Sequence, residues 1–126
     1  MNGAMKLRNV VLDLLGVAVL VLKGRYSGPG EQFIKAYAGN LGVSFALYFV
    51  AMLVMPQSAR GRVSAALVTL AAVTLFEITD GFGVMANVYD AWDLVANASG
   101  VCLAVFVDLL TAYLLSRSRR TRPAVA

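Results

Sequence analysis

Apolar residues in this chain are grouped into four segments, each close to the length that crosses a membrane as a helix. A transmembrane helix needs about 20 predominantly apolar residues, with a range of roughly 17 to 25. Of the 126 residues, 60% are hydrophobic and 14% are charged, whereas a soluble domain has about 25% charged residues. We therefore predict an all-α fold, a polytopic membrane protein built as an antiparallel bundle of four transmembrane helices. The predicted helices cover approximately residues 5–22, 36–55, 63–79 and 92–116, and residues 117–126 form a basic tail.

Short turn-forming sequences separate these segments. Glycine and proline follow the first segment at 28–30, Pro56 follows the second, and Gly81 follows the third. A regular helix is disfavoured at such positions. No internal repeat or low-complexity tract interrupts the pattern, so we predict a single integral membrane domain over residues 1–126.

Lysine and arginine are distributed unequally between the two ends of the predicted bundle. Cytoplasmic loops carry an excess of these residues, so we predict a bacterial cytoplasmic (inner) membrane protein with several spans and both termini in the cytoplasm. The basic side chains suit anionic headgroups, so membrane lipids are the expected partners and nucleic acid is not. If the chain crosses four times, eight basic residues lie on the side of the termini (Lys6, Arg8, Arg60, Arg62, Arg117, Arg119, Arg120 and Arg122) and three on the other (Lys23, Arg25 and Lys35).

Cysteine and histidine usage excludes several kinds of chemistry. Histidine is absent, and Cys102 is the only cysteine. An intramolecular disulfide, a Ser-His-Asp or Cys-His catalytic set and the usual histidine-containing zinc sites are therefore excluded. We predict no cofactor and no resident metal ion.

The remaining candidates for chemistry are acidic and amide side chains between the third and fourth predicted helices. Glu77 lies near the end of the third helix, and Asp93 and Asn97 lie one turn apart at the start of the fourth. Ionisable groups are costly in lipid and usually face a bundle interior or a polar cavity. We predict that these three residues form a ligand-binding or polar site, without assigning a catalytic residue. Four further carboxylates are secondary candidates: Asp13, Asp80, Asp90 and Asp108.

Small residues in the fourth predicted helix allow a structural interpretation of the same face. At about 100° per residue, Asp93, Asn97, Gly100 and Ala104 share one side of the helix. Ala96, Gly100 and Ala104 form a small-xxx-small series, which lets helix backbones approach closely. We expect these three residues to pack against another helix, with no room for a residue larger than alanine at Gly100. Asn97 could equally be an interhelical hydrogen-bond donor.

The carboxylates have structural alternatives too. Asp93 could cap the start of the fourth helix, whereas Glu77 lies near a helix C-terminus, where the helix dipole disfavours an anion. Asp13 and Asp108 lie in the cytoplasmic half of the predicted bundle, within reach of an arginine side chain. If they instead share a desolvated pocket, one of them would tend to be protonated.

The second half of the chain is similar to the VanZ-like membrane proteins. The features that carry the resemblance are a Glu in a Leu-Phe-Glu-Ile sequence, a loop, and then Asp-x-x-x-Asn-x-x-Gly opening the last helix. In the first half only the hydropathy matches, with Tyr37 and Asn40 near the start of the second helix. Carried over position by position, the resemblance singles out Glu77, Asp93, Asn97 and Gly100.

Two departures from the VanZ-like pattern affect what the resemblance implies. Thr79 and Asp80 stand where a Gln usually follows the Glu, and the loop before Asp93 lacks the usual Arg. The family is linked to glycopeptide-antibiotic tolerance and envelope biology. We therefore expect a non-enzymatic envelope protein that binds a lipid-linked or antibiotic ligand, or a partner protein, through its outward-facing acidic and amide cluster.

Two other functions stay open from the sequence. A small accessory subunit of a larger membrane complex is one, and the chain could also form a homo-oligomer. A metal-assisted enzyme acting on lipid-linked phosphates is the other, with Glu77, Asp90 and Asp93 holding a divalent cation such as Mg²⁺, which prefers oxygen ligands.

Overall fold

Four α-helices make up most of the structure, a computed structural model that describes residues 1–79 and 90–121. The described residues contain no β-strand, which confirms the all-α prediction. The helices are α1 (Gly3–Leu22), α2 (Glu31–Val54), α3 (Ala59–Ile78) and α4 (Ala91–Arg120), and a short 3-10 helix, η1 (Lys23–Arg25), follows α1.

Polar side chains define where three of the helices begin. Asn2 caps α1, Ser58 caps α3 and Asp90 caps α4, each accepting a hydrogen bond of 3.0 to 3.1 Å from a backbone N–H of the first turn. These N–H groups have no partner within their own helix, so the caps stabilise the helix starts. Asp90, and not Asp93, is therefore the residue that caps α4.

The helices extend beyond the predicted boundaries into polar sequence. α2 begins at Glu31 and α3 at Ala59, and α4 continues to Arg120. The predicted boundaries followed long apolar sequences, whereas α2 begins with the polar residues Glu31 and Gln32. An ion pair between Glu31 and Lys35 stabilises this first turn, a spacing that favours helix. The first residues of the predicted basic tail thus form the end of α4, where arginine also suits the helix dipole. Residues 122–126 lie outside the described part of the chain.

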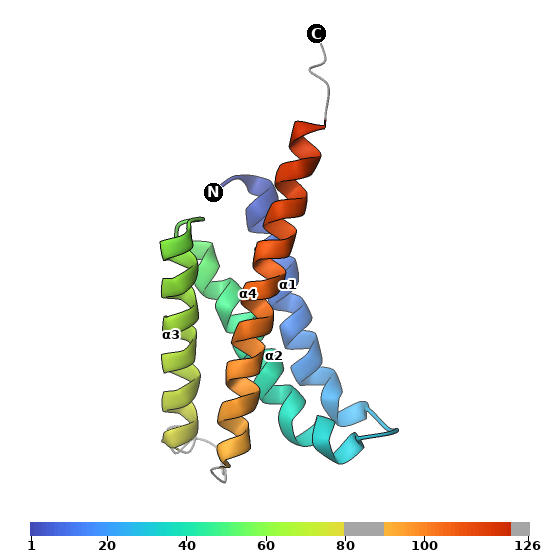
Figure 1. Ribbon diagram of the computed structural model, residues 1–126. Helices are drawn as coiled ribbons and strands as arrows, with labels where there is room; N and C mark the ends of the chain where they lie inside the picture. Colours follow the sequence, from blue (N-terminus) through green and yellow to red (C-terminus); the bar gives the residue numbers. More distant parts are fainter. Residues whose placement is uncertain (80–89, 122–126) are drawn as a thin grey trace.

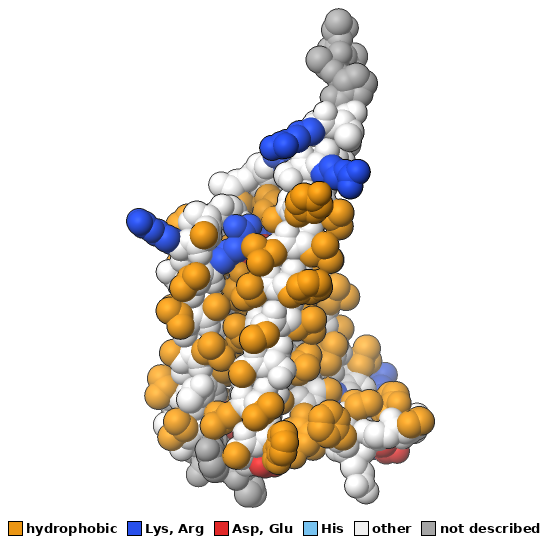
Figure 2. Space-filling view, in the orientation of Figure 1, with side chains coloured by type: hydrophobic (Ala, Val, Ile, Leu, Met, Phe, Trp, Pro, Cys, Tyr) orange, Lys and Arg blue, Asp and Glu red, His pale blue; other side chains and the backbone are white. Residues whose placement is uncertain are grey.

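Three of the helices, α2, α3 and α4, are long and apolar enough to cross a membrane. They indicate a membrane protein. α1 also has 20 residues, but Lys6, Arg8 and Asp13 interrupt its apolar sequence. Figure 2 shows apolar side chains covering most of the visible face, with Lys and Arg gathered at the end where α4 finishes.

Helix α2 is the centre of the bundle and packs against α1, α3 and α4. α3 also packs against α4, whereas the backbones of α1 and α3 do not come together. The start of α1, the end of α4 and the connection between α2 and α3 lie at one end of the molecule (Figure 1). The connection between α1 and α2 lies at the other end, together with the end of α3 and the start of α4.

The core lies along α2, where aromatic and small residues meet. Tyr48, Phe49 and Met52 are completely buried and pack with Ala65 of α3 and Ala104 of α4. The close approach of α1 to α2 depends on a pair of glycines. A Cβ at Gly16 would lie 2.7 Å from the carbonyl oxygen of Gly42, so the backbones touch at this point. Small residues at such contacts are typical of helices packed in membranes.

Candidate functional site

A groove of about 780 Å³ lies at the end of the bundle where α3 finishes and α4 begins. We call it the Asp93 groove. Apolar side chains form most of its lining, among them Leu20, Leu47 and Leu75, from α1, α2 and α3 respectively. These three leucines are also exposed on the outside of the bundle, so the apolar lining continues to the surface. Its polar lining residues are Lys23, Asn40, Glu77, Asp93 and Asn97.

All three residues of the predicted polar site line this groove. Glu77 and Asn97 are each 3% exposed and Asp93 is 9% exposed. Glu77 comes from the last turn of α3, and the other two come from the first two turns of α4. The structure thus brings Glu77 of α3 together with Asp93 and Asn97 of α4, across the loop that joins the two helices.

Residues of α2 hold the two acids at the start of α4. Asn40 Nδ2 donates a hydrogen bond of 2.6 Å to Asp93 Oδ1, and the Tyr37 hydroxyl donates one of 3.0 Å to Asp90 Oδ2. Asp90 accepts the cap hydrogen bond on its other oxygen. Both carboxylate oxygens of Asp90 therefore accept hydrogen bonds within the bundle. The described residues supply no hydrogen-bond donor to Asp93 Oδ2.

The side-chain amide of Asn97 has no hydrogen-bond partner among the described residues, and its Nδ2 atom is fully buried. A buried amide that makes no hydrogen bond costs about 1–3 kcal/mol, and most such groups in proteins are satisfied. Asn97 lines the Asp93 groove. The interhelical hydrogen bond considered for it from the sequence is absent within this described part of the chain.

Lys23 supplies the positive charge that lines the groove. Its side chain lies across Gly39, where a Cβ would come within 2.5 Å of Nζ. Asp93 interacts electrostatically with Lys23 and also with Glu77 and Asp90. The polar end of the groove therefore carries more negative than positive charge.

The small residues of α4 lie beneath this site. Gly100 packs against α2, where a Cβ would come within 2.5 Å of the Leu41 carbonyl oxygen and would overlap the Ser44 hydroxyl. This contact agrees with the expectation that nothing larger than alanine fits at Gly100, and even the first side-chain carbon meets backbone. Ala104 is fully buried in the core, and Ala96 is half-buried.

A second polar cluster joins all four helices near their other end. Asp108 of α4 is completely buried. Its Oδ2 accepts hydrogen bonds from the Tyr48 hydroxyl at 2.8 Å and from Arg62 Nε at 2.9 Å. Its Oδ1 lies 2.6 Å from Arg8 Nη2, an ion pair without the alignment of a hydrogen bond. We call these four residues the Asp108 cluster.

The Asp108 cluster shows whether Asp13 and Asp108 pair with each other or with arginines. Asp108 pairs with two arginines, and Asp13 makes no hydrogen bond or ion pair with residues 1–79 or 90–121. Asp13 is half-buried on α1. The shared pocket for these two acids is therefore not formed. Asp80, another secondary candidate, lies outside the described residues.

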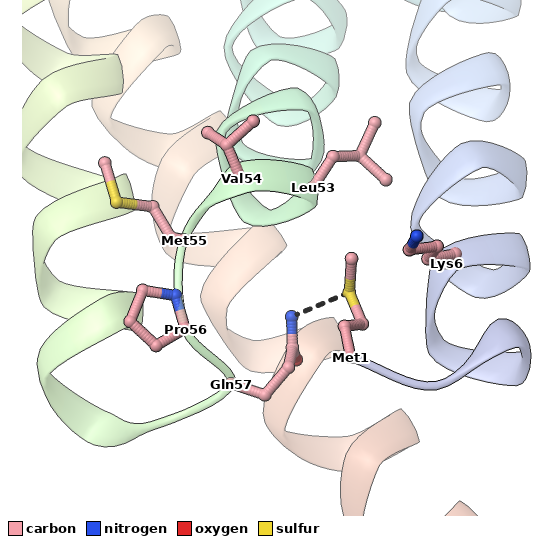
Figure 3. Close-up of a pocket in the computed structure, with 7 residues that line it drawn as sticks. All are labelled: Met1, Lys6, Leu53, Val54, Met55, Pro56 and Gln57. Carbon is pink, nitrogen blue, oxygen red and sulfur yellow. Dashed lines mark hydrogen bonds between the residues drawn. The ribbon is translucent and has the colours of Figure 1, made fainter.

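A second pocket, of about 560 Å³, adjoins this end of the bundle (Figure 3). Among the described residues that line it, Lys6 carries the one charged side chain, and the others come from Met1, the end of α2 and the connection from α2 to α3. Gln57 Nε2 donates hydrogen bonds to the Met52 carbonyl oxygen and to Met1 Sδ, at 3.2 and 3.3 Å. This pocket contains none of the predicted site residues, so the Asp93 groove is the stronger candidate for ligand binding.

No three His, Cys, Asp or Glu side chains within the described ranges are grouped so as to hold a metal ion. Glu77, Asp90 and Asp93 are therefore not gathered as three ligands of one cation. Asp90 is instead engaged by Tyr37 and by the α4 N-terminus.

Sequence reasoning missed the residues that complete both clusters. Lys23 was predicted to be a basic residue at the end of the first helix, without a place beside the acids. Tyr37 and Asn40 were noted for their position alone. Tyr48 gave no signal, because it lies within an apolar sequence.

Comparison of the chain with protein-family models, with curated proteins and with solved structures gives no match.

Proposed function

We propose that this protein is a bacterial cytoplasmic-membrane protein that binds an amphipathic, lipid-linked ligand in the Asp93 groove. The observation that carries the proposal is the combination of an apolar lining that reaches the bundle surface with a buried polar end. Ligand sites between the helices of a bundle are commonly mostly apolar, with a few polar groups that fix orientation. A lipid-like molecule presents the matching arrangement of an apolar chain and a polar head.

The proposal includes four transmembrane helices in an antiparallel bundle, with both termini in the cytoplasm. The support for α1 as a fourth span is the pairing of Arg8 with buried Asp108, which lowers the cost of placing a guanidinium in the bundle. The basic last turn of α4 supports a cytoplasmic location for this end. The groove would then open near the outer surface of the membrane.

The similarity to VanZ-like proteins agrees with this proposal, because Glu77, Asp93 and Asn97 are the residues that it singles out and they line one groove. We propose a role in envelope biology on that basis. The groove holds carboxylates, amides and one ammonium group, a set suited to binding by charge and hydrogen bonds.

A pair of variants on α3 tests whether the groove binds lipid. Ala72 lines the groove and is exposed, whereas the neighbouring Ala71 is exposed but does not line it. Native mass spectrometry of protein extracted in mild detergent would measure the bound lipid. We expect Ala72→Trp to fill the groove and abolish lipid retention, and Ala71→Trp to retain lipid as the unaltered protein does. Equal retention by both variants would refute the proposal.

A further inference from the structure

We infer that the Asp93 groove selects a lipid whose headgroup ends in a primary ammonium beside a phosphate. This inference rests on the proposed function and specifies the chemistry of the ligand. It depends on three features of the polar end of the groove: its charge, its available hydrogen-bonding atoms and the position of Lys23.

The charge of the groove favours a cationic group. Glu77 and Asp93 both line it and are buried, against the single ammonium of Lys23. Like charges held close in a poorly solvated site repel each other, and a bound cation relieves that repulsion. An anionic headgroup without an amine would add to it.

The available hydrogen-bonding atoms require a ligand that both donates and accepts. Asp93 Oδ2 receives no donor from the described residues, and the buried Asn97 Nδ2 has no acceptor among them. A primary ammonium has three donors and no acceptor, so it satisfies the carboxylate. Phosphate oxygens of the same headgroup would accept from Asn97.

Lys23 lies where it could bind the phosphate. Its ammonium lies against Gly39 in the groove lining, close enough to Asp93 to interact with it electrostatically. Hydrogen bonds between charged groups are roughly twice as strong as neutral ones. A zwitterionic headgroup therefore matches both the charges and the hydrogen-bonding atoms of the groove. Its ammonium would lie toward Asp93 and its phosphate toward Lys23 and Asn97.

Three lipids with identical acyl chains separate these requirements. Phosphatidylethanolamine has the primary ammonium, phosphatidylcholine has the positive charge without an N–H donor, and phosphatidylglycerol has hydroxyl donors without the positive charge. The delipidated full-length protein would be incubated with each lipid in detergent, and retention would be measured by native mass spectrometry. We expect phosphatidylethanolamine to bind about tenfold more tightly than either of the others, because one charge-assisted hydrogen bond distinguishes them.

Variants then assign the preference to the groove. Asp93→Asn should remove the preference for phosphatidylethanolamine, and Asp13→Asn, at a half-buried carboxylate outside the groove, should keep it. The comparison of lipids on the unaltered protein needs no variant, so it decides the question even if Asp93→Asn does not fold. Equal binding of the three lipids would overturn this inference, while the proposed function would stand if Ala72→Trp still blocks binding. Loss of the contrast between Ala72→Trp and Ala71→Trp would overturn both.

Discussion

Asn40 of α2 donates a hydrogen bond of 2.6 Å to Asp93 of α4, and so holds a groove carboxylate from a helix that lies 53 residues earlier in the chain. The pairing uses one carboxylate oxygen. Because no described residue donates to the other oxygen, Asp93 combines a fixed position with an atom available to a ligand. This arrangement is typical of a binding group oriented by its neighbour.

Asn97→Leu should stabilise the ligand-free protein and weaken lipid binding. The substitution replaces a buried amide that lacks a partner among the described residues with an apolar side chain of similar size. Removing an unsatisfied group should raise the free energy of unfolding by about 1–3 kcal/mol. Unfolding in an SDS titration would measure it. A lower stability of the lipid-free variant would show that the amide has a structural partner.

Asp108→Asn should destabilise the bundle strongly. The change leaves the guanidinium groups of Arg8 and Arg62 without their buried carboxylate, and breaking a buried pair in this way costs about 3–5 kcal/mol. The same SDS titration would measure the loss. Asp13→Asn is the control, for which we expect a change within about 0.5 kcal/mol. Equal effects of the two variants would mean that the Asp108 cluster does not stabilise the bundle.

Gly100→Ala should lower stability although it adds one methyl group. The new Cβ would overlap the α2 backbone at Leu41, and forcing α4 away from α2 costs about 1–3 kcal/mol. Ser99→Ala alters the neighbouring exposed position and should have little effect. Thermal unfolding in detergent would compare them. If both variants melt at the same temperature, the two helices do not pack as closely as the structure has them.

Single cysteines should report four membrane crossings. In a Cys102→Ser background, Ser27→Cys should react with an impermeant maleimide added outside the cell, and Ala4→Cys and Ser118→Cys should not. The reason is the excess of basic residues at the end that holds both termini. Labelling of Ala4→Cys together with Ser27→Cys would mean that α1 does not cross. Labelling of both Ala4→Cys and Ser118→Cys, with Ser27→Cys unlabelled, would mean that the orientation is reversed.

Helical periodicity predicted much of α4, because a repeat of about 100° per residue is a local property. It placed Asp93, Asn97, Gly100 and Ala104 on one face, and all four are buried. The helix ends were predicted too short, since apolar sequence marks only the part of a helix suited to lipid. The sequence offered Asp93 as a possible cap of α4, whereas the structure has Asp90, three residues earlier, in that role.

The partners of the buried acids could not be predicted from the sequence, because they depend on how the helices pack. Arg8 and Asp108 are 100 residues apart, and Tyr48 and Asp108 are 60 apart. The sequence allowed an arginine partner for Asp108, but only the packing of the helices shows that Arg8 and Arg62 are the partners. The absence of room at Gly100 likewise depends on the distance between two helix axes, which a small-residue spacing does not specify.

The most direct test of ligand binding in the Asp93 groove is the nuclear magnetic resonance signal of the Asn97 side-chain amide. With phosphatidylethanolamine added to the full-length protein in deuterated detergent, we predict nuclear Overhauser effects between this amide and the lipid headgroup. The Asn9 amide is the internal control, because it already donates to the Met52 carbonyl oxygen at 3.2 Å. Asn97→Leu would assign the signal by removing it. Contacts from the headgroup to Asn97 but not to Asn9 would support the groove as the binding site, and bound lipid that gives no contact with Asn97 would contradict it.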